Sequence, residues 1–239
     1  MLTLIISLSL SALIYLGTYY FTFNHIVSSI LAVITLFLVN FLIGRKVFKK
    51  LNGLFTSIQK DMNLGHYEKA IKKLNDGLRL SKWQFMIKKQ INSQLGIIYY
   101  LKKDKKKAKD YLLKGTLKNY IAASMLATLY YKEKKYDKCK EVMEKAIKAS
   151  KKEGFLYSLY AYFLYRMNEK GKAIEILNKG VKKAPLDEKL NSNLDALKNG
   201  KKIKMQNYGQ IWLQLNIDKV PEGIRPYHMI LANKRFKPR

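Results

Sequence analysis

The chain of 239 residues is strongly basic, with 46 Lys and Arg against 17 Asp and Glu and a formal net charge of +29. All of these charged side chains lie in residues 45–239, so an uncharged apolar part precedes a polar, Lys-rich part. The single cysteine, Cys139, excludes an internal disulfide and a multi-cysteine zinc site. The three histidines are widely separated, so we expect no metal site.

The uncharged part contains two apolar stretches, Leu2–Phe23 and Ile26–Ile43, with only Asn24 and His25 between them. A helix needs about 20 apolar residues to cross a bilayer core of about 30 Å, and each stretch has roughly that length. The membrane-proximal basic residues follow directly: Arg45, Lys46, Lys49 and Lys50. Because positive charge stays on the cytoplasmic side, the pattern predicts a transmembrane hairpin over residues 1–44 with the rest of the chain in the cytoplasm.

Two alternatives compete with the hairpin. A cleaved signal peptide has a charged start and an apolar stretch of about 7–15 residues, whereas no charge precedes Arg45 here and the stretches are longer. The other alternative is a pair of buried helices in a soluble protein. We expect an integral membrane protein, of the bacterial inner (cytoplasmic) membrane.

A small residue recurs in the polar part at nearly regular intervals. These residues are Ala70, Ala108, Cys139 and Ala173, and a large apolar residue follows each of them four positions later. A second small residue precedes three of these positions, at Gly96, Ala127 and Ala161. Small residues allow two helices to approach closely, so the pattern predicts repeated pairs of packed helices.

This pattern resembles the tetratricopeptide repeat, a helix–turn–helix unit of about 34 residues. Four units follow, at about 51–84, 89–119, 120–153 and 154–187, and the fourth matches best because Pro185 stands at the family's closing proline. The first unit departs from the family pattern, with Ile58 and Asp61 where a small residue and a tyrosine are usual.

The predicted fold class is therefore all-α, and the alternative to a repeat is an irregular helical bundle. We expect the hairpin at 1–44, then a solenoid of about four helix pairs within 45–200. A capping helix over Leu186–Leu197 closes the solenoid before Gly200. Residues 201–239 form a third part, a C-terminal helix and an extended tail.

The resemblance implies a right-handed superhelix whose concave face is lined by the first helix of each unit. In each Tyr-Tyr pair one ring packs inward and its neighbour, about 100° round the helix, faces the groove. This interpretation assigns Tyr99 and Tyr130 to packing. The predicted partner-binding residues are Tyr100, Tyr131, Tyr162 and Tyr165, with Lys132 and Arg166 at the rim and Ser93, Ile97, Ser124, Thr128 and Ser158 between them. Family members that hold acidic chaperone tails present Lys and Asn here, so that specificity is not expected.

Lysines also gather at the turns between paired helices, as in Lys102–Lys107 and Lys132–Lys138. Such a field attracts anionic lipid, nucleic acid or an acidic protein. Screening over about 8 Å limits lipid binding to Arg45–Lys60 and whatever else leans on the bilayer. Nucleic acid is the less favoured partner, because only six of the basic residues are arginine and no nucleic-acid-binding motif is visible.

The C-terminal part begins with a short amphipathic run. Tyr208, Ile211, Trp212 and Leu215 share one helical face, although the alternation from Ile211 to Ile217 also fits a strand. We favour a helix packed on the last repeat. Pro221, Pro226 and Pro238 then predict an extended arm over Val220–Arg239, which can fold back into the groove.

No motif of catalysis is present: no phosphate loop, no nucleophile elbow, no metal-binding His pair and no dinucleotide turn. Cys139 lies at a helix-packing position and is expected to be a buried structural thiol. We therefore expect no enzyme activity and no cofactor. The predicted function is a membrane-tethered scaffold that binds a protein or peptide client; a lipid or nucleic-acid binder and an accessory subunit of a membrane complex are the alternatives. The sequence names neither the client nor the oligomeric state.

Overall fold

The computed structural model describes residues 1–217, which form helices without any strand in that range. The chain divides into two compact units, Met1–Ile91 and Asn92–Arg239. The predicted arm over residues 220–239 lies outside the described residues. The prediction of an all-α chain is confirmed.

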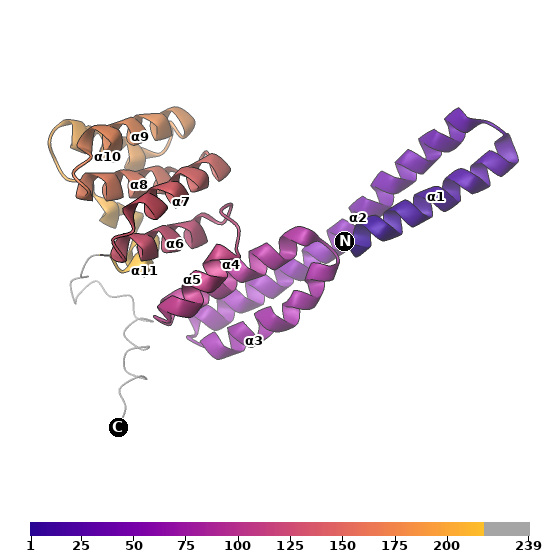
Figure 1. The fold of residues 1–239 in the computed structure, drawn as a ribbon, viewed down its shortest axis with the longest axis horizontal. Helices are drawn as coiled ribbons and strands as arrows, with labels where there is room; N and C mark the ends of the chain where they lie inside the picture. The colour runs from indigo at the N-terminus through magenta and orange to yellow at the C-terminus, as the bar shows by residue number, and fades with distance from the viewer. Residues whose placement is uncertain (218–239) are drawn as a thin grey trace, which may run out of the picture. The chain divides into compact units, whose positions relative to one another are not determined.

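Two antiparallel helices open the first unit: α1 (Leu2–Thr22) and α2 (His25–Asn63) (Figure 1). The predicted turn between them is confirmed. Phe23 takes a left-handed conformation with φ 52° and ends α1, and the side chain of Asn24 caps α2 by accepting hydrogen bonds from the next amides. The two helices are long and apolar enough to cross a membrane, by length and composition.

The hairpin carries its polar side chains inside and its apolar side chains outside. Ser11 donates a hydrogen bond to the carbonyl of Ala32 at 2.8 Å, and the amide of Asn40 donates to Ser7 at 2.9 Å. Large leucines, isoleucines and phenylalanines cover the outer surface. This inversion of the usual order suits a hydrocarbon surrounding, in which polar groups must find partners within the protein.

The helix α2 continues without a break to Asn63, so it reaches about 58 Å at 1.5 Å per residue. The second apolar stretch and the first helix of the first predicted repeat are thus one helix. Beyond the apolar stretch, α3 (Tyr67–Gly77) packs on α2 through the fully buried Ala70 and Leu74. The predicted first helix pair is present in this form, followed by a short helix η1 (Leu78–Lys82).

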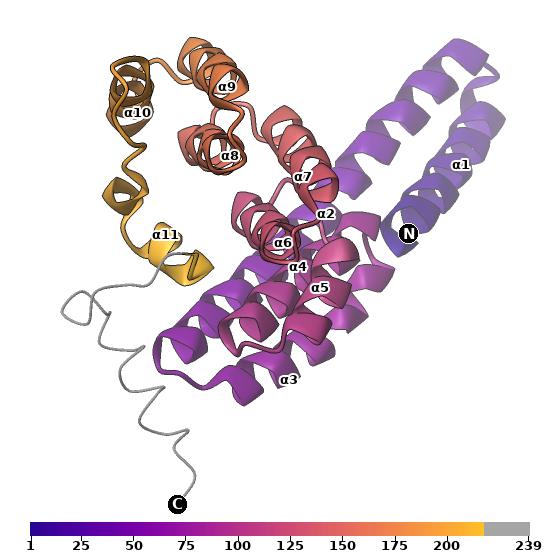
Figure 2. The same cartoon turned by 60° about the vertical axis from the view of Figure 1, so that its left-hand side comes forward.

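The second unit is a row of helix pairs that α4 begins (Figure 2). The three pairs coincide with the predicted second, third and fourth units: α4 (Phe85–Leu101) with α5 (Lys105–Leu113), α6 (Tyr120–Lys132) with α7 (Tyr136–Ala149), and α8 (Gly154–Arg166) with α9 (Lys170–Lys183). The predicted capping helix follows as α10 (Glu188–Lys198).

The turn within each pair repeats one backbone device. Lys103, Lys134 and Asn168 take the left-handed conformation, with φ of 65°, 57° and 63°, directly after the first helix of their pair. The intervals between these positions equal those between the small residues of the second helices α5, α7 and α9. The repeat is therefore visible in the turns as well as in the packing.

The predicted close contacts between helices are confirmed. Ala127 and Ala161 are fully buried in the first helices, and Ala108 and Ala173 in the second. At Gly96 a Cβ atom would lie 2.6 Å from the side chain of Leu112 and 3.0 Å from its backbone nitrogen, so only glycine fits.

Cys139 occupies the same small-residue position in α7 and is fully buried. Burial raises the pKa of its thiol to about 12. We expect the native chain to resist alkylation by iodoacetamide at pH 8, because the thiolate is the reactive form. Cys139 should be fully labelled within minutes only in denaturant. Mass spectrometry of the native and the denatured chain measures the alkylated fraction. Rapid labelling of the folded chain would contradict the buried position.

The chain after α10 forms two short helices, η2 (Met205–Tyr208) and α11 (Gln210–Leu215). The prediction of a helix here is confirmed, although α11 has only six residues. The helix α11 contacts α6 of the third repeat, and its Trp212 meets Tyr162 of α8 in the fourth repeat, which η2 also contacts.

Candidate functional site

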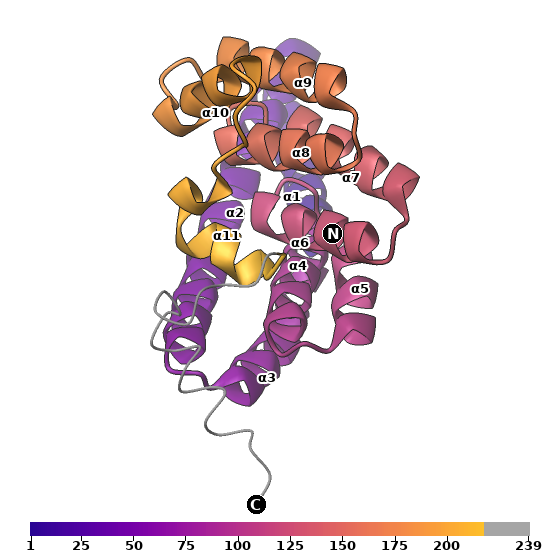
Figure 3. The same ribbon diagram turned by 90° about the vertical axis from the view of Figure 1, so that its left-hand side faces the viewer.

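The candidate site is the side of the solenoid that is formed by the first helices α4, α6 and α8. Residues 201–217, called the C-terminal segment below, lie along α8 and α6 on the side away from α7 (Figures 2 and 3). Four apolar side chains of this segment are buried: Ile203, Met205, Trp212 and Leu215. The C-terminal segment therefore occupies the side of the solenoid at which the sequence predicts the groove.

Aromatic contacts hold the segment on α8. The ring of Trp212 meets Tyr162 edge-on with 5.0 Å between the ring centroids, and the ring of Tyr208 meets Phe155 at 5.1 Å. The hydroxyl groups of Tyr208 and Ser158 are hydrogen-bonded at 2.8 Å. Burial raises the pKa of Tyr208, so its hydroxyl group stays protonated in this contact.

Polar contacts hold the end of the segment near α4 and α6. The hydroxyl of Tyr100 donates to the carbonyl of Leu215 at 2.6 Å. The ammonium of Lys132 donates to the carbonyls of Leu215 and Asn216 at 3.0 and 2.7 Å. These carbonyls end α11 and have no partner within the helix, so Tyr100 and Lys132 cap it.

The predicted groove residues fall into two sets. Tyr100, Tyr162 and Lys132 contact the C-terminal segment, as groove residues should. Tyr131 instead stacks on Phe163 with 4.7 Å between ring centroids, so it packs between neighbouring repeats. Ser93 accepts a hydrogen bond from the amide of Thr116 and so braces the loop after α5. The predicted part of Tyr131 in partner binding stays a prediction.

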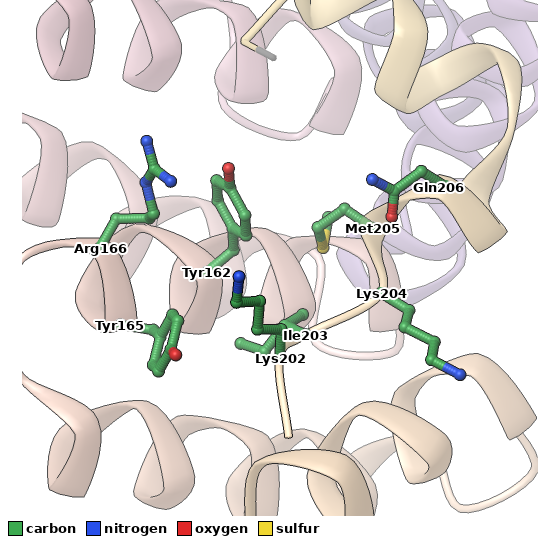
Figure 4. Close-up of a pocket in the computed structure, with 8 residues that line it drawn as sticks. All are labelled: Tyr162, Tyr165, Arg166, Lys202, Ile203, Lys204, Met205 and Gln206. Carbon is green, nitrogen blue, oxygen red and sulfur yellow. The ribbon is translucent and has the colours of Figure 1, made fainter. Parts of the chain in front are cut away.

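An open cavity of about 400 Å³ remains between α8 and the C-terminal segment (Figure 4). The cavity is lined from α8 by Tyr162, Tyr165 and Arg166, and from the segment by Lys202, Ile203, Lys204, Met205 and Gln206. None of these eight residues is acidic.

The cations of this cavity differ in direction. The ammonium of Lys202 turns towards the ring of Tyr162, whereas the ammonium of Lys204 points away (Figure 4). The guanidinium of Arg166 lies 6.0 Å from the centroid of the Tyr162 ring. Arg166 and Lys202 therefore give the cavity its positive character, and the tyrosine rings give it flat apolar walls.

The sequence interpretation missed the half of this cavity that comes from the C-terminal segment. The signal for it is the alternation of Lys202, Ile203, Lys204 and Met205, in which the two apolar residues are buried and the two lysines exposed. This alternation is typical of an extended segment with one face against the protein.

The basic residues that the sequence predicts to lie near a membrane are exposed on α2. Arg45, Lys46, Lys49 and Lys50 surround the buried side chains of Val47 and Leu51, which pack towards the rest of the first unit. The α2 helix thus keeps one basic face just beyond its apolar stretch.

Helix pairs stacked in one direction, with their first helices lining one side, define an α-solenoid repeat protein. Residues 122–153, which span most of α6 and all of α7, match the family model described as a tetratricopeptide repeat. The chain therefore contains a tetratricopeptide repeat, at the position that the sequence predicts for the third repeat. No curated protein matches the chain significantly.

Proposed function

We propose that this chain is a membrane-tethered protein-interaction module that holds an acidic segment of a client protein in the cavity beside α8. The observation that carries this proposal is the cavity of about 400 Å³ with Arg166 and Lys202 at its wall and no acidic residue among the described residues that line it. The tetratricopeptide repeat supports the general role, since its family consists of protein-interaction modules.

The occupied groove decides which surface a client meets. Burial of Trp212 and of Leu215 stabilises the bound segment by about 1.5–3 kcal/mol for each side chain. Because the segment belongs to the same chain, it avoids the translational and rotational cost that a separate client incurs on binding. A client must overcome this contact to displace the segment. The cavity that the segment leaves open needs no displacement, and we infer that the client binds there.

The chemistry of the cavity selects an acidic client. A carboxylate can take two parallel hydrogen bonds from the guanidinium of Arg166, and the ammonium of Lys202 adds a second charge. The faces of Tyr162 and Tyr165 offer contact area with few rotatable bonds. An acidic residue flanked by an apolar one fits this combination.

The membrane tether rests on α1 and α2. At 21 residues α1 spans about 31 Å, close to the thickness of a bilayer core. Within the most apolar 18 residues of each helix, only 17% is buried in α1 and 11% in α2. The core helices of soluble proteins are mostly buried. The basic residues after the second stretch favour the cytoplasmic side for the repeats. The tether would raise the effective concentration of the client beside a membrane complex.

Site-specific photocrosslinking tests the proposal. A photoreactive residue replaces Tyr165 in the full chain, expressed in its native membrane, and the crosslinked peptide is identified by mass spectrometry. We expect a protein segment rich in Asp or Glu. The variant R166E/K202E should reduce crosslinking at least about tenfold, which corresponds to about 1.4 kcal/mol.

The matched control is K148E/K151E, which changes net charge equally at exposed positions of α7 and the following turn. This control should crosslink as the unmodified chain does. Unchanged crosslinking in R166E/K202E, or crosslinks to nucleic acid or lipid alone, would contradict the proposal.

A further inference from the structure

The pairing between α1 and α2 shows which residues of the first unit lie at the same height along the hairpin axis, called a level below. Ser11 pairs with Ala32 and Ser7 with Asn40, so the start of α1 lies beside the stretch of α2 that precedes Arg45. Figure 1 shows the N-terminus next to α2 at this level. Since α1 has the length of a bilayer core, this level is one membrane surface when the hairpin spans.

A third stretch of the chain is bound at the same level. The hydroxyl of Thr3 donates a hydrogen bond to the carbonyl of Trp83 at 2.9 Å. From α2, a Cβ atom at Gly44 would lie 3.3 Å from the amide nitrogen of Gln84. The turn between η1 and α4 is therefore held against both helices of the hairpin where their apolar parts end.

This turn has the composition of a membrane interface. Trp83 is half-buried and Phe85 is 61% exposed, and Phe48 on α2 is 60% exposed. Aromatic side chains of this kind gather where the hydrocarbon meets the headgroups. Exposed large aromatic rings have no evident role in a water-facing turn, so their position favours contact with lipid.

The two segments that meet at this level are basic. Arg79 and Lys82 are exposed in the short stretch that ends at Trp83, and the basic residues of α2 are exposed just after its apolar stretch. No Asp or Glu occurs in residues 1–60 or in residues 77–103. Two segments distant in sequence thus contribute cations, and neither supplies a carboxylate to neutralise them. We name the set the basic collar: Arg45, Lys46, Lys49, Lys50, Arg79 and Lys82.

We propose that the basic collar, with Trp83 and Phe85 as aromatic anchors, binds anionic lipid headgroups at the membrane surface. This inference rests on the proposed membrane tether and adds to it a lipid preference and a second contact segment, residues 79–85. Each lysine or arginine near an anionic surface adds attraction, and the collar concentrates six of them around the hairpin. The segment would fix the angle at which the chain leaves the membrane.

Trp83 provides the probe for this proposal. The chain has two tryptophans, so the variant W212F leaves Trp83 alone while keeping an aromatic ring at position 212. The full chain is reconstituted in vesicles of phosphatidylcholine and phosphatidylglycerol in which either lipid carries bromine, and quenching of fluorescence by each lipid is compared. We expect phosphatidylglycerol to be preferred about fivefold or more at low salt, falling towards onefold at high salt.

Variants in the W212F background separate the collar from the tether. R79E/K82E and, independently, R45Q/K46Q should lower the preference towards onefold while brominated phosphatidylcholine still quenches and circular dichroism is unchanged. K148E/K151E should leave the preference intact.

Equal quenching by both lipids in W212F would overturn the collar and leave the tether standing. An undiminished preference in R79E/K82E would also overturn the proposal, since it removes residues 79–85 from the contact. Absence of quenching by any brominated lipid, with the chain released from membranes by carbonate, would overturn the tether and the collar together.

Discussion

Replacement of Trp212 by alanine should cost about 3–5 kcal/mol of unfolding free energy, the range for a large aromatic side chain removed from a packed site. Trp212 is only 4% exposed and its ring meets Tyr162 edge-on. Loss of the indole ring should release the C-terminal segment from the groove. The burial of Leu215 and the hydrogen bonds from Tyr100 and Lys132 all depend on α11, the short helix that Trp212 anchors. Urea unfolding of the detergent-solubilised chain, followed by circular dichroism, measures the change.

The control for this variant is Gln210→Ala, at an exposed position of α11. It should change the unfolding free energy by less than about 0.5 kcal/mol. A second measurement uses W83F, in which Trp212 is the only tryptophan. Its emission should be blue-shifted and should move to the red when Tyr162 is replaced by alanine. An effect of Trp212→Ala below about 1 kcal/mol would mean that the segment does not bind the groove.

This prediction concerns a feature that the sequence indicated only in part. The face of Tyr208, Ile211, Trp212 and Leu215 predicts a helix, and α11 is present. Periodicity gives no information about which surface receives a short apolar face. The contact with Tyr162 joins residues 50 positions apart, so no local pattern reports it.

The repeat itself was predictable because it uses local rules many times. Small residues at Ala108, Cys139 and Ala173 mark where helices approach, and the turns fall at the same spacing. The extent of α2 was not predictable from the hydropathy pattern, which ends at Ile43. Residues 45–63 contain no proline and simply continue the helix, so the change from apolar to basic composition leaves no mark on the backbone.

The candidate site divides in the same way. Tyr100, Tyr162 and Arg166 could be placed on the groove side from their phase in the repeat. Lys202 could not, because its position depends on a segment outside the repeat. The position of a residue in the repeat is not enough to place Tyr131. Its ring stacks on Phe163 of the next repeat, a contact between repeats that the position within one repeat does not indicate.

Phe163→Ala should likewise cost about 3–5 kcal/mol. Phe163 is fully buried in α8 and stacks on Tyr131 of α6, so it joins two first helices. In a solenoid, stability is a sum of terms for each repeat and each interface, and this variant weakens the interface between the third and fourth repeats. Hydrogen exchange should show faster exchange in α6 and α8, with α1 unchanged.

The stack between Phe163 and Tyr131 can be measured separately by a double-mutant cycle. If Tyr131 acts in packing, Tyr131→Ala and Phe163→Ala together should cost less than the sum of the single changes, by about 0.5–1.5 kcal/mol for the aromatic pair. Crosslinking from position 165 should survive Tyr131→Ala at temperatures where the chain stays folded. Additive costs combined with lost crosslinking would instead return Tyr131 to the client-binding surface, because a ring that contributes nothing to the stack is available to a partner.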